Sequence, residues 1–167
     1  GSFTCTLFMP FENHKYSFDK LTSKEKVEAF FIEVFPDFFA MMPDVANAWE
    51  DHPLSSLAII RCKPWHHGKV ALMGDAAHGT VPFYGQGMNA GFEYCRVLFN
   101  LMEKHQEEWP AVFEEYSRVR KPDGDALQDL SLDNYLVMRD YVADPDFILR
   151  KKIEAKFSEL YPSRWMP

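Results

Sequence analysis

Hydrophobic residues in the first half of the chain form short runs that are typical of β-strands. Residues 3–9 alternate and are rich in β-branched and aromatic types, and residues 55–62 form a second apolar run. Both patterns predict strands. A shorter apolar run at 70–73 predicts a buried strand that stops at Gly74 and Asp75.

Between and after these runs, apolar residues recur at the three- and four-residue spacing of helices. A capping box at Thr22 and Glu25 predicts the start of the first helix, Pro36 ends it, and two short helices follow within 37–49. A later stripe predicts a long helix, starting near residue 88, whose apolar side faces the core. The members of this stripe are Met88, Phe92, Cys95, Phe99 and Met102.

Prolines divide the remaining helical pattern. Pro110 fits the first turn of a helix that Pro122 is expected to end, a further helix runs from about 123 to 141, and a last one begins at Asp144-Pro145. Strands therefore come first, helices come last, and one strand-to-helix crossover lies between them. This order predicts an α/β fold, or α+β when the chain is taken as a fragment.

Composition narrows the class of protein. Apolar residues make up 47% of the 167 residues, enough for a packed core, and the formal net charge of -7 argues against a nucleic-acid or anionic-membrane partner. Cys5, Cys62 and Cys95 are odd in number and far apart, which predicts reduced thiols and a cytoplasmic compartment. No apolar run approaches the ~20 residues that a membrane-spanning helix needs.

The candidate chemistry lies in residues 69–91. Asp75 directly follows a strand, so its carboxylate can accept hydrogen bonds from cofactor hydroxyls, although a lone Gly-Asp more often makes a simple turn. Gly85 and Gly87 place backbone N–H groups at a helix start, where the helix dipole favours a negative or electron-rich group. Two glycines alone indicate only a tight turn. The two features together predict a cradle for a large polar cofactor.

These residues carry a family resemblance. Residues 74–78 (GDAAH), Pro82 and residues 85–89 (GQGMN) resemble the second FAD-binding motif of the single-component flavoprotein aromatic hydroxylases. The flanks are similar to the members of that family that act on kynurenine. The flanking segments are 6–11, 81–93, 129–131, 134–135 and 138–139. The likeness covers nearly the whole chain and implies the C-terminal part of an FAD-binding, Rossmann-like fold.

The resemblance implies a role for each residue of the motif. Asp75 binds the ribitol hydroxyls of FAD, and the loop from Gly85 to Asn89 lies under the isoalloxazine ring. Pro82 sits beside the ring face where oxygen reacts, and no side chain acts as a catalytic acid or base. The implied cofactor-binding residues are Gly74, Asp75, Pro82, Gly85, Gln86, Gly87, Met88 and Asn89.

The resemblance also implies the reaction. NADPH reduces the flavin, and O2 adds to give a C4a-hydroperoxide. The distal oxygen is transferred to L-kynurenine, which becomes 3-hydroxykynurenine. The cofactor supplies this chemistry, while the protein supplies orientation and a dry pocket.

Five residues carry over to the substrate site by the same resemblance. They are Phe3, Phe83, Tyr84, Gln86 and Asn134. For Phe3 and Phe83, plain core packing is an equal alternative. Asn134 lies on an apolar stripe of the helix predicted at 123–141, where a buried amide needs a partner. A helix-to-helix hydrogen bond is the alternative to its implied role in holding the substrate carboxylate.

The resemblance divides the chain into three parts. Residues 1–62 end a substrate-binding sheet domain with inserted helices, 63–122 return to the FAD-binding domain, and 123–167 form a helical region that covers the substrate site. A metal site is not expected, because the spacing of the histidines and Cys62 matches no ligand pattern. His66, His67 and His78 are expected in surface loops instead.

Two parts of the family pattern are missing from the sequence. It has no G-x-G-x-x-G turn to grip the FAD diphosphate, and the family's arginine and tyrosine for the substrate carboxylate lie in the same absent part. We therefore expect a portion of an enzyme that does not turn over alone, on the cytosolic face of the mitochondrial outer membrane if it is eukaryotic. Two alternatives stay open, namely a flavin hydroxylase of another aromatic compound and a non-catalytic helical interaction module.

Overall fold

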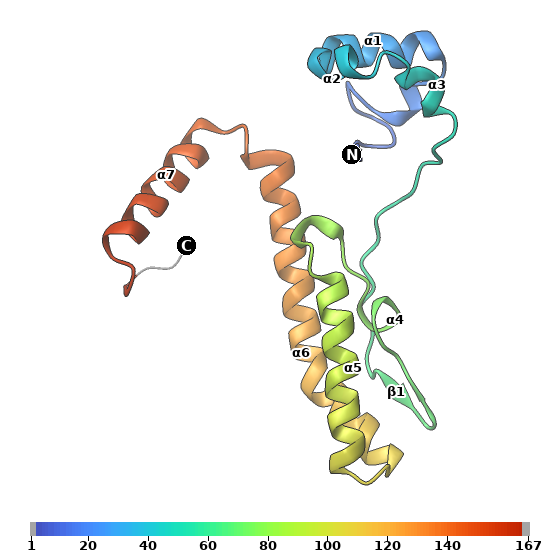
Figure 1. The fold of residues 1–167 in the computed structure, drawn as a ribbon, viewed down its shortest axis with the longest axis vertical. Helices are drawn as coiled ribbons and strands as arrows, with labels where there is room; N and C mark the ends of the chain where they lie inside the picture. Colours follow the sequence, from blue (N-terminus) through green and yellow to red (C-terminus); the bar gives the residue numbers. More distant parts are fainter. Residues whose placement is uncertain (1–2, 165–167) are drawn as a thin grey trace. The chain divides into compact units, whose positions relative to one another are not determined.

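The computed structural model describes residues 3–164, so the outermost residues of the predicted three-part division lie outside the described ones. Contacts group the chain into two compact units, Gly1–Ser56 and Leu57–Pro167 (Figure 1). Each unit has its own buried cluster of apolar side chains. The helix-rich composition with one small sheet is compatible with an α/β fragment.

The first unit is helical. Its elements are the 3-10 turn η1 (Phe18–Lys20) and the helices α1 (Lys24–Val34), α2 (Pro36–Met41) and α3 (Val45–Trp49). The three helices confirm the predicted helical spacing. The N-cap position of α1 is Ser23 and not Thr22, and its side chain makes no capping hydrogen bond, so the predicted capping box does not form. Val27, Phe30 and Phe31 lie on one face of α1 because they are three and four residues apart, and they pack against α3.

The strand predicted at residues 3–9 is wrong, since the described residues of the first unit contain no strand. A strand is stable only beside another strand that takes its backbone hydrogen bonds. Within the described part of the chain, the one sheet is a two-stranded hairpin in the second unit. The alternating pattern at residues 3–9 therefore has no neighbouring strand to pair with.

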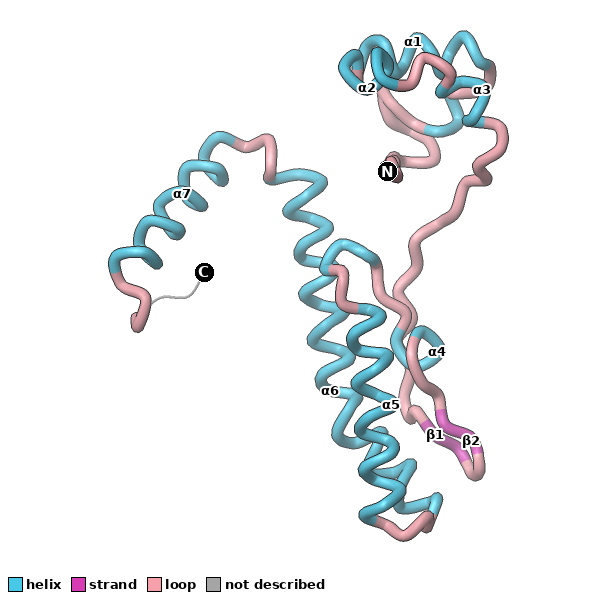
Figure 2. Tube along the Cα trace, viewed as in Figure 1, coloured by secondary structure: helices cyan, strands magenta, loops and turns pink. Residues whose placement is uncertain are grey.

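The hairpin consists of β1 (His66–His67) and β2 (Val70–Ala71), which pair antiparallel (Figure 2). The buried strand predicted at 70–73 is therefore only two residues long, and Val70 is 64% exposed. The strand predicted at 55–62 is also wrong. There the N–H of Ile60 donates to the carbonyl of Gly79 at 3.0 Å, so a loop holds this extended segment and no strand pairs with it.

Two long helices frame the second unit. α5 (Gly87–Lys104) and α6 (Trp109–Leu136) run side by side in opposite directions (Figure 1). Between them and the hairpin lies a core rich in aromatic rings. Its buried members are Trp65, Ala77, Tyr94, Leu101, Val112 and Tyr116. This core anchors the segment between β2 and α5, which holds the candidate cofactor motif.

The start of α5 confirms the prediction, but its buried face does not. Met88, Phe92 and Phe99 are 73%, 66% and 58% exposed, so most of the apolar stripe predicted to face the core faces outward, and only its last member, Met102, packs against the core. The buried face instead carries Tyr94 and Leu101. Spacing predicts that a helix is amphipathic, whereas the neighbours that the chain supplies decide which face is covered.

The predicted helix break at Pro122 is wrong, because α6 continues through it. Proline cannot donate to the carbonyl four residues earlier, and in a helix interior it costs about 3 kcal/mol. Packing just beyond the proline offsets this cost, since Gly124 and Gln128 are both buried in the second unit. Tertiary contacts thus override the local signal.

After α6 the chain makes a π-helical turn, η3 (Val137–Tyr141), and then forms α7 (Pro145–Leu160). The carboxylate of Asp144 accepts hydrogen bonds from the N–H groups of Asp146 and Phe147, at 2.9 and 3.4 Å, and so caps α7, which begins where the sequence predicts. No helix within residues 3–164 combines the length and apolar character needed to cross a lipid bilayer.

Candidate functional site

The candidate motif forms two short helical turns between β2 and α5. These are α4 (Asp75–His78) and the 3-10 turn η2 (Pro82–Tyr84), and α5 follows directly. Glycines make the changes of direction. Gly74 has φ 60° and ψ -142°, and Gly85 has φ 68° and ψ 19°, conformations that residues with a Cβ rarely adopt.

Asp75 occupies the first position of α4 and is exposed. A Cβ placed on the neighbouring Gly74 meets no atom within 4 Å, so the space beside this turn is open. The same is true of Gly85. An exposed carboxylate next to open backbone is the arrangement that a hydroxyl-bearing ligand requires.

The N-terminus of α5 forms the second half of the candidate cradle. Gln86 precedes the helix, and its side-chain oxygen accepts a hydrogen bond from Asn89 Nδ2 at 2.8 Å. The first backbone N–H groups of a helix have no acceptor within that helix, so those of Gly87 to Asn89 are suited to a ligand. A Cβ on Gly87 would lie 3.7 Å from Thr80 Cγ2, which places this terminus beside the segment that leaves α4.

Two of the predicted substrate residues of the second unit, Phe83 and Asn134, meet at η2. The ring of Phe83 lies 4.8 Å from that of Tyr135, measured between centroids, and the Asn134 side-chain amide donates to the carbonyl of Phe83. Asn134 is half-buried, and its hydrogen bond joins α6 to η2 and not one α-helix to another. Tyr84 and Gln86 follow Phe83 in the sequence, and both are exposed. Phe3 belongs to the first unit and is exposed there, so its role stays a prediction.

His78, expected in a surface loop, is instead buried and only 2% exposed. Its Nε2 lies 2.6 Å from the hydroxyl of Tyr94, and its Nδ1 lies 3.4 Å from the carbonyl oxygen of Gly74. Burial lowers the pKa of His78, which keeps the imidazole neutral at neutral pH. Burial also raises the pKa of Tyr94 to about 12, so its hydroxyl keeps its proton.

A second buried contact, which sequence reasoning missed, fixes the end of α4. Gln128 is fully buried, and its Nε2 donates to the carbonyls of Ile60 and Gly79, both at 2.7 Å. One turn earlier on α6, a Cβ on Gly124 would lie 2.8 Å from His78 Cδ2. A glycine inside a helical pattern is a signal of close packing, and Gln128 lies four residues after it on the same face.

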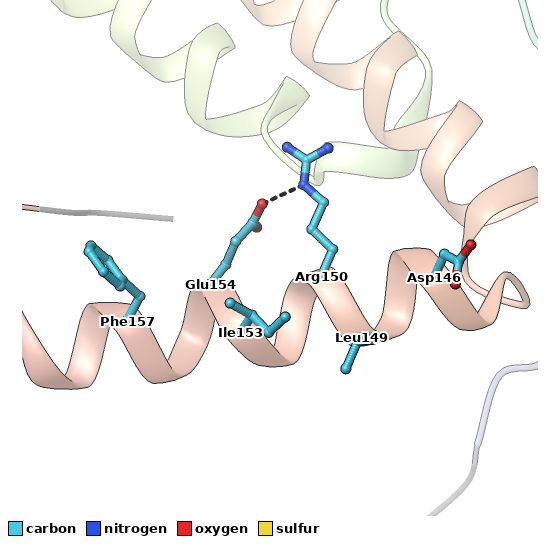
Figure 3. Close-up of a pocket in the computed structure, with 6 residues that line it drawn as sticks. All are labelled: Asp146, Leu149, Arg150, Ile153, Glu154 and Phe157. Carbon is cyan, nitrogen blue, oxygen red and sulfur yellow. Dashed lines mark hydrogen bonds and ion pairs between the residues drawn. The ribbon is translucent and has the colours of Figure 1, made fainter.

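The motif residues do not form a metal site in the described part of the chain, where no group of three or more His, Cys, Asp or Glu is placed to hold one. A shallow hollow lies elsewhere, on α7 (Figure 3). It is lined by Leu149, Ile153 and Phe157, with the Arg150–Glu154 ion pair at 2.8 Å beside them. None of these is a predicted site residue.

Comparison with known proteins identifies the family. The model of a family described as "FAD binding domain" matches residues 38–131, which is more than half of the chain. The chain belongs to the FAD binding domain family. The cradle between Gly74 and Asn89 lies within the matched segment.

Curated relatives align along the whole chain. Proteins named kynurenine 3-monooxygenase are 49% identical in Flavobacterium psychrophilum, 42% in Myxococcus xanthus and 41% in Dictyostelium discoideum. The alignments cover 100%, 99% and 99% of this chain and 37%, 36% and 39% of the relatives. The chain thus spans little more than a third of the length of these relatives. The resemblance inferred from the sequence is confirmed.

Proposed function

We propose that the protein carrying this chain is an FAD-dependent monooxygenase that hydroxylates L-kynurenine to 3-hydroxykynurenine, using NADPH and O2. The observation that carries the proposal is 49% identity over the whole chain to a relative named kynurenine 3-monooxygenase. The family match adds FAD as the cofactor of the domain.

The residues of the cradle fit one end of FAD. Asp75 presents an exposed carboxylate, which accepts hydrogen bonds from ribitol hydroxyls. The space beside Gly74 and Gly85 is open, so a ligand can approach the backbone closely there. The first turn of α5 has backbone N–H groups without an acceptor in the helix, which are suited to the same ligand. The helix dipole at α5 favours the negative charge of a reduced flavin. Bound FAD supplies the redox chemistry, and these residues hold and orient it.

The substrate side of the proposed site runs from Pro82 to Gln86. Pro82 opens η2 and is exposed, which suits a residue beside the ring face where oxygen reacts. Phe83 and Tyr84 offer aromatic surface for a planar substrate, with Gln86 at the start of α5. We propose that Asn134, fixed against Phe83, contributes to binding the substrate carboxylate. A substrate role for Phe3 is proposed from the resemblance alone.

The proposed enzyme needs more protein than the chain provides. Its relatives are about 2.7 times as long as the aligned segment. The sequence lacks the glycine-rich G-x-G-x-x-G turn that binds the FAD diphosphate. We propose that the rest of the enzyme completes a Rossmann-like FAD fold, and that the chain alone does not turn over. The three-part division at residues 62 and 122 belongs to this proposal. The three free cysteines favour a cytoplasmic location.

The test uses the intact protein. It is expected to purify with bound yellow flavin, to oxidise NADPH faster when L-kynurenine is added, and to release 3-hydroxykynurenine detectable by mass spectrometry. Stimulation by another aromatic compound but not by kynurenine would assign a different hydroxylase. A protein without flavin would overturn the enzyme proposal and favour an interaction module.

A further inference from the structure

We propose that His78 and Tyr94 form a positioning pair that holds the Gly74–Asp75 turn in the shape that binds FAD. The inference rests on the proposed function of this turn. Neither side chain is placed to touch a ligand, because both are buried in the aromatic core of the second unit. They act on Asp75 through the backbone.

The directions of the hydrogen bonds follow from the Gly74 carbonyl, which can only accept, so one tautomer of the ring satisfies both contacts. In that tautomer the Tyr94 hydroxyl, which lies 3.2 Å from Nδ1 and 2.6 Å from Nε2, donates to the unprotonated Nε2. Nδ1 of the same ring then carries the hydrogen and points to the Gly74 carbonyl at 3.4 Å. The chain of contacts runs from α5, through one imidazole, to the peptide group that joins Gly74 to Asp75.

The turn needs external support because α4 is only four residues long. A single helical turn is unstable on its own, since one hydrogen bond does not offset the entropy of fixing its residues. The carbonyl of Gly74 also accepts from the backbone N–H groups of Ala77 and His78, both at 3.0 Å. The imidazole therefore reinforces the same carbonyl that closes the turn. Any rotation of this carbonyl reorients Asp75.

Other side chains of the core pack against His78 and Tyr94. The Trp65 ring lies 5.9 Å from that of His78 and 5.7 Å from that of Tyr94, measured between centroids. The Arg120 guanidinium lies 4.8 Å from the centroid of the Tyr94 ring. Gly124 permits this approach, because a Cβ there would lie 2.8 Å from His78 and 3.1 Å from the Tyr94 hydroxyl. The imidazole thus has little freedom to leave Gly74.

Tyr94→Phe tests the pair with a matched control. It removes only the hydroxyl that fixes His78. Tyr116→Phe removes a hydroxyl from the same core that is buried and has no hydrogen-bond partner within the described residues. In the intact protein, we expect Tyr94→Phe to raise the dissociation constant for FAD about 5- to 10-fold, the effect of one lost hydrogen bond, and Tyr116→Phe to change it less than about 2-fold. FAD titration followed by flavin fluorescence measures both.

Unfolding of the apoprotein separates positioning from simple stability. If Tyr94→Phe lowers the apoprotein unfolding temperature but binds FAD as the wild type does, the pair is only structural and the inference is overturned. The variants His78→Asn and His78→Leu provide a second test. The asparagine Nδ2 can still donate to the Gly74 carbonyl, whereas leucine cannot. We expect His78→Asn to bind FAD more tightly than His78→Leu, and equal affinities would also contradict the inference. A wild-type protein that binds no FAD would instead overturn the proposed function, and the inference with it.

Discussion

Asn134 connects two segments that the proposed substrate site needs in a fixed relation. Its amide donates to the Phe83 carbonyl across 51 positions of sequence, so it sets η2 against α6. Sequence reasoning placed this residue on a mostly apolar helix face and required a partner for it. The identity of that partner could not be predicted, because it is a backbone atom in a distant turn.

Asn134→Ala is predicted to raise KM for L-kynurenine by about 10-fold or more while FAD stays bound. The magnitude follows from losing a hydrogen bond to a charged carboxylate, about 1.5–3 kcal/mol. Steady-state kinetics and the flavin absorbance of the purified variant give the two readouts. Asp133→Ala, on an exposed neighbour in α6, is the control and should leave KM unchanged. An unchanged KM for Asn134→Ala would return this residue to a packing role.

Glu115 is predicted to make folding stability depend on pH. Its carboxylate binds Lys104 Nζ at 2.8 Å, His105 Nε2 at 2.5 Å and Arg118 at 3.3 Å. Hydrogen bonds from Lys104 and then His105 lower the pKa of Glu115 from 4.5 to about 2. A lowered carboxyl pKa stabilises the fold above the unfolded-state value, and this stability is lost as the pH falls from about 4.5 towards 2.

Thermal unfolding of Glu115→Gln checks this sign. We expect the intact variant to unfold at a lower temperature than the wild type at neutral pH. The difference should shrink as the pH falls from about 4.5 towards 2, because Glu115 then becomes protonated first in the unfolded and then in the folded state. The adjacent Glu114 is exposed, so Glu114→Gln is the control and should show little difference at either pH. A Glu115→Gln difference that persists at low pH would assign the effect to packing.

At the scale of elements, helix spacing was informative and strand patterning was not. The helices α1, α5 and α7 form where apolar residues recur every three or four positions, because a helix satisfies its own backbone. Residues 3–9 and 55–62 have strand-like patterns but form no strand, because a strand requires a partner that the pattern does not specify. Pro122 gave a local signal for a helix end, but α6 continues through it. Its helix is held by tertiary contacts.

Pro122→Ala is predicted to stabilise α6. The proline is exposed and cannot donate to the carbonyl of Arg118, and alanine restores that donor without disturbing the core. Denaturant unfolding of the intact protein should show a gain of about 1–3 kcal/mol, the range set by helix propensity. Pro110→Ala is the control in the first turn of the same helix, where proline costs little. A loss of stability would show that Pro122 sets a bend that the packing of Gly124 requires.

At the scale of the whole molecule, one face of α5 exposes large apolar side chains. Sequence reasoning predicted that Phe92 and Phe99 are core residues, and in the structure they are 66% and 58% exposed. Large exposed apolar patches mark surfaces that another protein, a membrane or a ligand contacts. The chain spans 37% of its Flavobacterium psychrophilum relative. We therefore expect the rest of the polypeptide to cover this face of α5. Phe92 and Phe99 would then be buried in the intact protein, as the sequence predicts, although they are exposed in this chain.

The double variant Phe92→Gln/Phe99→Gln tests that expectation through two opposite effects. In the isolated chain it should reduce self-association, measured by sedimentation velocity, because exposed apolar area is removed. In the intact protein it should lower the unfolding free energy by about 3–5 kcal/mol or more, because buried phenylalanines lose their packing. Asn100→Gln, at an exposed polar position of the same helix, should do neither. An intact protein of unchanged stability would mean that this face of α5 stays uncovered in the intact protein too, and that the predicted burial of the stripe is wrong there as well.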